Sequence, residues 1–270
     1  MSDELFDLRG QVVVITGGLG QLGRQYASAL ARRGARVAIF DPLARDQDLP
    51  PELAESGEVA AWPVDVTSRE SLREGLAEVR QRWDTPSGLI NNAALDSPPD
   101  APAEETGPFE TYPESSWDRV LEVNLKGVFL ACQVIGGAMA RAGRGSIVNI
   151  CSTYGLVSPD QRLYRYREQE TGQPFFKPVA YSVSKSGLLN LTRYLATYWA
   201  GRGVRVNTLS LGGVFNQQDP RFLEGYCRRV PLGRMAREDE YNGAVIFLLS
   251  RASSYMTGAN LVIDGGWTAW

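Results

Sequence analysis

Val12-Val13-Val14-Ile15-Thr16-Gly17-Gly18-Leu19-Gly20-Gln21-Leu22-Gly23 is the stretch that decides the fold. Its β-branched residues predict a strand buried on both faces, and the apolar spacing that continues to Arg33 predicts a helix. A glycine-rich turn between a strand and a helix directs backbone N–H groups and the helix N-terminus at a diphosphate. The same turn also serves tight packing alone, so by itself it indicates cofactor binding only weakly.

Strand and helix patterns alternate along the rest of the chain. The sequence carries no linker, repeat or low-complexity segment that would interrupt them. We therefore predict an α/β fold, one doubly wound domain over residues 1–270, whose ligands bind beyond the carboxyl ends of the strands. The further strands are expected at residues 35–40, 59–62, 88–90, 145–150, 204–209 and 260–263, and the longer helices at 71–83, 114–142, 181–199 and 238–249.

The composition argues against several classes of protein. The 270 residues are 43% hydrophobic and 22% charged, as in globular proteins, and the net charge of −3 argues against a general nucleic-acid binder. No apolar run is long enough to span a membrane, and the acidic N-terminus does not resemble a signal peptide. Three scattered cysteines predict free thiols in a reducing compartment, the cytoplasm. The absence of histidine removes histidine triads and most zinc sites, so we expect no metal.

Tyr181 and Lys185 stand four residues apart where a predicted helix begins. Residues at this spacing share one helix face. A nearby ammonium favours the phenolate and lowers a tyrosine pKa, and a pKa tuned towards the working pH suits a general acid–base catalyst. A partly buried ring beside a solvated ammonium also arises by chance on many helices, so the pair alone does not establish catalysis.

Asp41 ends the second predicted strand. A carboxylate at this place accepts hydrogen bonds from the hydroxyls of an adenosine ribose. It also repels a 2′-phosphate, which favours NAD over NADP. Arg45 is close enough in the sequence to complicate this preference. The alternative is an aspartate that only forms a turn before Pro42.

Two segments show no regular period. Residues 156–180 are rich in arginine and aromatic side chains and join Ser152 to Tyr181, whereas residues 214–234 are mostly polar. We expect both to border the substrate pocket, the second as a lid; a solvated loop with a few anchored rings is the alternative for the first. A polar substrate, in particular an anion, is suggested by the cationic side chains of the first segment: Arg162, Arg165, Arg167 and Lys177.

A set of motifs, in order over nearly the whole chain, resembles the short-chain dehydrogenase/reductase family. The resemblance implies a seven-stranded parallel sheet of order 3-2-1-4-5-6-7, a nicotinamide cofactor and a catalytic tetrad. It also implies a homotetramer or homodimer packed through the helices that bear Asn124 and Tyr181. The motifs are the turn from Thr16 to Gly23, Asn91-Asn92-Ala93-Ala94, Asn124, Ser152, Tyr181 with Lys185, and Asp264-Gly265-Gly266.

The resemblance also implies a role for each matching residue. Tyr181 would exchange a proton with the reacting oxygen, and Ser152 would orient that oxygen. Lys185 would bind the nicotinamide ribose and hold down the Tyr181 pKa, while Asn124 would hold a water that relays protons to the solvent. The cofactor-binding residues would be Gly17, Gly20, Gln21, Leu22, Asp41, Asp65, Val66, Asn92, Ala93, Tyr181, Lys185 and Val214.

We expect an NAD-dependent oxidoreductase that interconverts a secondary alcohol and a ketone on a polar small molecule, a sugar or a hydroxy acid. Two departures from the family's ordinary pattern qualify this expectation: Gln21 stands where the commonest subgroup has glycine, and the interval from Ser152 to Tyr181 is enlarged. The glycine spacing keeps open a nucleotide-sugar epimerase or dehydratase that retains its NAD. A non-catalytic dinucleotide sensor is the other alternative, although the intact tetrad argues against it. Trp267 and Trp270 are expected to pack locally, and the alternative is that they cap the pocket of a neighbouring subunit.

Overall fold

The computed structural model describes residues 4–45, 49–96 and 102–270. Its centre is a seven-stranded sheet in which every neighbouring pair of strands is parallel, in the order β3-β2-β1-β4-β5-β6-β7. This confirms the predicted fold class and strand order. The strands are β1 (Val12–Thr16), β2 (Arg36–Phe40), β3 (Val59–Trp62), β4 (Gly88–Asn91), β5 (Gly145–Ser152), β6 (Val204–Leu211) and β7 (Asn260–Ile263).

Strand β1 is buried on both faces because its side chains alternate between two cores. Val12 and Val14 belong to one hydrophobic cluster, and Val13 and Ile15 belong to the other. All five residues of the strand are buried. The continuous apolar run in the sequence is therefore the signature of a central parallel strand.

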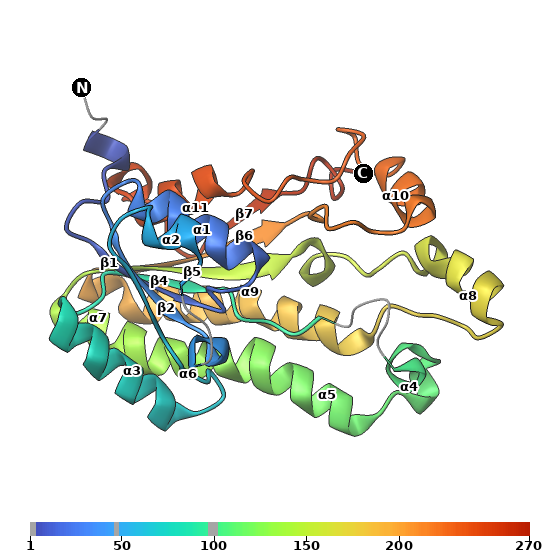
Figure 1. The fold of residues 1–270 in the computed structure, drawn as a ribbon, viewed down its shortest axis with the longest axis horizontal. Helices are drawn as coiled ribbons and strands as arrows, with labels where there is room; N and C mark the ends of the chain where they lie inside the picture. The colour runs from blue at the N-terminus through green and yellow to red at the C-terminus, as the bar shows by residue number, and fades with distance from the viewer. Residues whose placement is uncertain (1–3, 46–48, 97–101) are drawn as a thin grey trace.

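Helices cover both faces of the sheet (Figure 1). The core on one face is completed by α1 (Gln21–Ala31), the short α2 (Pro51–Ala54) and α11 (Asn242–Leu249). The opposite core is completed by α3 (Arg69–Arg82), α9 (Val179–Trp199) and a long helical stretch from Glu114 to Ala142.

The stretch from Glu114 to Ala142 is one long helix with two π-helical interruptions. It comprises α5 (Glu114–Leu121), α6 (Val128–Ala131) and α7 (Gly137–Ala142), separated by the π-helical segments Glu122–Gly127 and Cys132–Gly136. By length and mean hydropathy alone, 1.4, it could cross a membrane, which the apolar runs in the sequence did not suggest. However, 67% of the apolar window is buried inside the protein, as is usual for a helix that packs on a sheet.

Three short helices lie beyond the carboxyl ends of the strands: α4 (Ala103–Thr106), α8 (Arg165–Thr171) and α10 (Pro220–Cys227) (Figure 1). Helices α8 and α10 lie within residues 156–180 and 214–234, for which the sequence predicted no regular secondary structure. The sequence Asp219-Pro220 is typical of a helix N-terminus and could have predicted the start of α10. In the structure the Asp219 side chain accepts a hydrogen bond from the Arg221 N–H, and Pro220 occupies the first helical turn. The Pro, Glu and Asp content of residues 96–113 predicts a surface loop; α4 forms within this stretch, and residues 97–101 of the stretch lie outside the described residues.

A third cluster joins the two aperiodic segments to the C-terminus. Tyr164 packs against Phe222, Phe222 stacks on Tyr226, and Tyr226 stacks on Trp267 with ring centroids 4.6 Å apart. Ion pairs between Arg229 and Asp160 and between Arg221 and Glu170 connect the same segments. Trp267 therefore packs within its own chain, whereas Trp270 is 80% exposed.

Candidate active site

The glycine turn after β1 forms a tight cradle that has no room for a side chain at Gly17 or Gly23. Gly17 has a φ of +64°, and a Cβ there would lie 2.8 Å from the Ala93 Cα. A Cβ on Gly23 would lie 2.3 Å from the Gly17 carbonyl oxygen. The cradle lies between β1 and β4, where the strand order reverses, and this is where nucleotides bind in doubly wound sheets.

The end of β4 fixes the shape of the cradle. The Asn92 side-chain amide donates to the carbonyl oxygens of Thr16 and Gly17, at 3.2 and 2.9 Å. In return, the Thr16 hydroxyl accepts from the backbone N–H groups of Asn92 and Ala93, both at 3.1 Å. Asn92 and Ala93 are thus beside the glycine turn, as a role in cofactor binding requires.

The Asp41 carboxylate faces the same turn and is 5% exposed. One of its oxygens accepts from the Leu19 N–H at 3.1 Å, and the other accepts from the Leu43 N–H at 3.0 Å. The second bond is the turn-forming contact that was weighed as the alternative to ribose binding. Because a carboxylate has about four acceptor sites, the turn and the ribose do not exclude each other.

The other predicted cofactor residues lie around the crevice. Asp65 follows β3 and accepts from the Thr67 N–H at 2.8 Å, and its neighbour Val66 is buried. Gln21 donates from its side chain to the Phe215 carbonyl oxygen at 3.2 Å, which links the glycine turn to residues 214–234. Leu22 and Val214 line a cavity that opens beyond β5. Gly20 is the N-cap residue of α1.

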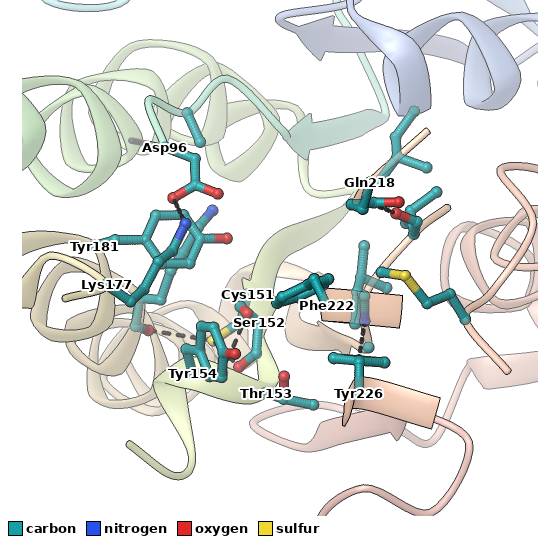
Figure 2. Close-up of a pocket in the computed structure, with 18 of the residues that line it drawn as sticks. Asp96, Cys151, Ser152, Thr153, Tyr154, Lys177, Tyr181, Gln218, Phe222 and Tyr226 are labelled. Carbon is teal, nitrogen blue, oxygen red and sulfur yellow. Dashed lines mark hydrogen bonds and ion pairs between the residues drawn. The ribbon is translucent and has the colours of Figure 1, made fainter. Parts of the chain in front are cut away.

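A cavity of about 360 Å³ opens beyond β5 and receives Ser152, Tyr181 and Lys185. In Figure 2, Tyr181, Lys177 and Asp96 stand on one side, while Gln218, Phe222 and Tyr226 stand on the other. The second group belongs to residues 214–234, which therefore contribute a wall of the cavity, as expected. This volume is within the range of small-molecule sites.

Burial raises the pKa of Tyr181 well above its ordinary value. The negative charge of Asp96 adds to this shift, whereas a hydrogen bond with the Ser152 hydroxyl opposes it. The predicted lowering of the Tyr181 pKa by Lys185 is therefore wrong for the pocket that the chain alone forms. Desolvation of a phenolate outweighs the nearby ammonium.

Lys185 is 3% exposed, and its ammonium donates to the Ile150 carbonyl oxygen at 2.9 Å. Its Nζ lies 5.8 Å from the centroid of the Tyr181 ring. Burial lowers the pKa of this ammonium. Lys185 is thus anchored near the end of β5, beside Tyr181, and lines the cavity.

Asn124 lies in the first π-helical segment and is fully buried. Its amide donates to the Leu95 carbonyl oxygen at 2.9 Å and to the Ser184 hydroxyl at 3.1 Å. Its carbonyl oxygen accepts from the Leu95 N–H at 2.7 Å. The side chain therefore clamps the loop after β4 to α9, and the water relay remains a prediction. A π-helical turn is a frequent mark of a functional position.

The three arginines predicted to face the substrate are not part of the cavity wall. Arg162 pairs with Asp160 and is 68% exposed, Arg165 is exposed, and Arg167 lies over the Phe175 ring. Lys177 is the member of the cationic group that reaches the cavity. No periodic pattern distinguishes the arginines from the lysine, because the backbone path of residues 156–180 decides which side chain reaches the cavity.

Asp96, Tyr154 and Tyr226 also line the cavity, and none was singled out from the sequence. Tyr226 accepts a hydrogen bond from the Gly213 N–H at 2.7 Å. Within residues 4–45, 49–96 and 102–270, no group of acidic, cysteine or histidine side chains could hold a metal ion.

Comparison with known proteins gives one consistent assignment. A family model described as enoyl-(acyl carrier protein) reductase matches residues 20–268. The D-threitol dehydrogenase of Mycolicibacterium smegmatis is 35% identical, over 97% of this chain and 95% of that protein. The chain is therefore an oxidoreductase that acts on CH–OH groups with a pyridine-nucleotide cofactor. It belongs to the short-chain dehydrogenase/reductase family.

Solved structures agree over nearly the whole length. A short-chain dehydrogenase from Leptospira borgpetersenii with bound NAD+ has a TM-score of 0.85 and 32% identity, covering 99% of this chain and 96% of that one. A gluconate 5-dehydrogenase from Burkholderia cenocepacia in complex with NADP and tartrate has a TM-score of 0.82 and 28% identity, covering 99% and 98%. Both nucleotides thus occur among proteins similar to this chain.

Proposed function

We propose that this enzyme interconverts a secondary alcohol and a ketone on a neutral polyol or sugar, with NAD as its cofactor. The observation that carries the proposal is that Ser152 and Tyr181 line the same cavity beside the glycine cradle. The named activity of the D-threitol dehydrogenase relative supports a polyol. Because none of Arg162, Arg165 and Arg167 lines the cavity, the reason for preferring an anionic substrate is removed.

The chain's residues divide the work of the reaction. The cradle around Gly17 and Gly23 would hold the diphosphate, and bound NAD supplies the acceptor for the hydride that leaves the carbinol carbon. Tyr181 takes the hydroxyl proton as the ketone forms, and Ser152, which hydrogen-bonds Tyr181, holds the reacting oxygen against it. Lys185 keeps a buried positive charge beside Tyr181, where it favours the phenolate that accepts this proton and where low polarity makes the charge effective.

The choice of NAD over NADP rests on Asp41. Its buried carboxylate points at the glycine turn, where it would accept hydrogen bonds from the ribose hydroxyls. A 2′-phosphate at the same place would meet a like charge in a site of low solvent exposure. The bound NAD+ of the Leptospira borgpetersenii relative is consistent with this preference.

A panel of substrates tests the proposed function. We expect the purified enzyme to form NADH from NAD with threitol, galactitol or glycerol, more efficiently than with gluconate or lactate, and to use NADP poorly. Initial rates of reduced-cofactor absorbance give kcat/KM for each pair. Turnover that prefers hydroxy acids would contradict the polyol, and a preference for NADP would contradict the role of Asp41.

The same panel separates the alternatives. An epimerase or dehydratase that retains NAD would convert its substrate without net NADH, so product analysis by chromatography accompanies the absorbance measurement. A dinucleotide sensor would bind NAD without turnover of any substrate. The Ser152–Tyr181 hydrogen bond at the cavity wall favours catalysis, because a sensor has no use for it.

The raised pKa of Tyr181 predicts opposite pH profiles for the two directions. Oxidation needs the phenolate, which a raised pKa makes scarce at neutral pH, so its rate should climb between about pH 6 and pH 10. Reduction needs the phenol, so its rate should hold at neutral pH and fall only at the alkaline end. Initial rates in both directions, with circular dichroism to check folding, measure this. An oxidation rate that declines over the same range would contradict it.

We further propose a homotetramer or homodimer in the cytoplasm. The outer faces of the helices that bear Asn124 and Tyr181 expose large apolar side chains that a second copy could cover. The three cysteines are free thiols, as expected in a reducing compartment. The exposed side chains are Phe129, Val183, Tyr194 and Tyr198.

A further inference from the structure

An ion pair faces the reaction cavity beside Tyr181. The Lys177 ammonium lies 2.5 Å from an Asp96 carboxylate oxygen and 5.4 Å from the centroid of the Tyr181 ring (Figure 2). The Lys177 side chain is only 10% exposed, whereas the Asp96 side chain is 52% exposed. Both residues line the cavity that contains Ser152.

Both ends of this pair are held by side-chain amides. Gln161 accepts from the Lys177 N–H at 2.8 Å and donates to the Lys177 carbonyl oxygen at 3.2 Å. Asn124 makes the same two-way contact with Leu95, the residue before Asp96. Two clamps of this kind restrict the backbone at each member of the pair, so the pair is positioned before any substrate arrives.

The pair offers what a hydroxyl group requires. A hydroxyl both donates and accepts, an ammonium has three N–H donors, and a carboxylate only accepts. A substrate hydroxyl can therefore accept from Lys177 and donate to Asp96 at once. A substrate carboxylate could use only Lys177, and the Asp96 charge would repel it.

We propose that Asp96 and Lys177 recognise a second hydroxyl of the substrate, near the carbon whose hydroxyl reacts at Tyr181. The inference rests on the proposed function and specifies it further, because it makes the enzyme selective for diols and polyols over single alcohols and over hydroxy acids. Lys177 belongs to the enlarged interval between Ser152 and Tyr181, so that interval supplies specificity through this one cation.

Three matched compounds test the pair: 2,3-butanediol, 2-butanol and 3-hydroxybutanoate. We expect the wild type to prefer the diol to 2-butanol, and Lys177→Met and Asp96→Asn each to reduce the ratio of their kcat/KM values by about 10- to 100-fold. The ratio matters because an effect transmitted through Tyr181 would change both alcohols equally. Lys126→Met and Asp84→Asn are the controls, since they remove one partner of exposed ion pairs outside the cavity.

The kcat/KM for the anion 3-hydroxybutanoate is expected to change differently in the two variants. Asp96→Asn leaves the Lys177 charge uncompensated, so 3-hydroxybutanoate should improve relative to the diol, whereas Lys177→Met should not improve it. Melting temperatures confirm that each variant folds. Diol-to-monoalcohol ratios equal to wild type in both variants would overturn the proposal and leave the ion pair as a structural contact.

Ligand-observed NMR with NADH separates this proposal from the proposed function. The alcohols cannot be oxidised when the cofactor is already reduced, so the signal reports binding alone. Preferential binding of 2,3-butanediol that is lost in both variants supports the pair even if no turnover is found. Equal binding of the diol and 2-butanol by the wild type overturns it.

Discussion

Replacing Tyr181 with phenylalanine is expected to lower kcat by about 10²- to 10⁴-fold, the usual contribution of a positioned acid–base group. The ring and its packing stay, and the hydroxyl that hydrogen-bonds Ser152 is removed. Among the described residues of the cavity, the Asp96 carboxylate is paired with Lys177, and the Lys185 ammonium donates to the Ile150 carbonyl oxygen. Steady-state rates with saturating polyol and NAD measure the loss.

Tyr194→Phe is the matched control for this experiment. Tyr194 lies on the same helix, is 62% exposed and stacks on Tyr198 outside the cavity. Its loss should leave the rate near that of the wild type. NADH binding measured for Tyr181→Phe shows whether the cofactor site survives. Near-normal turnover in Tyr181→Phe would sink the assignment of this tyrosine as the acid–base group.

Gly23→Ala is expected to destabilise the enzyme and to weaken cofactor binding at least about tenfold. The added Cβ would lie 2.3 Å from the Gly17 carbonyl oxygen and 2.6 Å from the Gly18 Cα. Both are backbone atoms, so relief requires the cradle itself to move. Such overpacking costs about 1–3 kcal/mol, which corresponds to a melting temperature lower by about 2–10 °C for a chain of this size.

Gly243→Ala provides the comparison. It also places a methyl group on a helix, in α11, but a Cβ there meets nothing within 4 Å. Alanine has the better helix propensity, so this variant should be as stable as the wild type or slightly more stable. Thermal unfolding and NADH titration of both variants measure the difference. A stable Gly23→Ala protein with normal NADH affinity would show that the turn tolerates a side chain.

The sequence predicted the framework well because the framework depends on local pattern. The run from Val12 to Ile15 has both faces apolar, as a central parallel strand must, and the glycine turn follows it directly. The placement of Ser152 at the end of β5 and of Tyr181 in the first turns of α9 followed from motif order. All seven predicted strands are present, and they differ from the observed bounds by no more than two residues at either end.

The inner surface of the cavity could not be predicted in the same way. Which cation of residues 156–180 faces the substrate depends on the backbone clamp between Gln161 and Lys177, a contact across 16 positions with no periodic signal. The Tyr181 pKa depends on how much water the folded pocket excludes, which spacing does not encode. Asp96 is identified as a candidate site residue by its contact with Lys177 in the folded structure, and not by any sequence pattern.

The contacting rings of Tyr164, Phe222, Tyr226 and Trp267 have a consequence for substrate entry and product release. They fasten residues 156–180 to residues 214–234 and to the chain end, so neither segment can swing outward while the other stays. Tyr226 is also tethered to Gly213, just after β6. We therefore expect the two segments at the mouth of the cavity to move together. Substrate entry and product release would then both require one concerted opening.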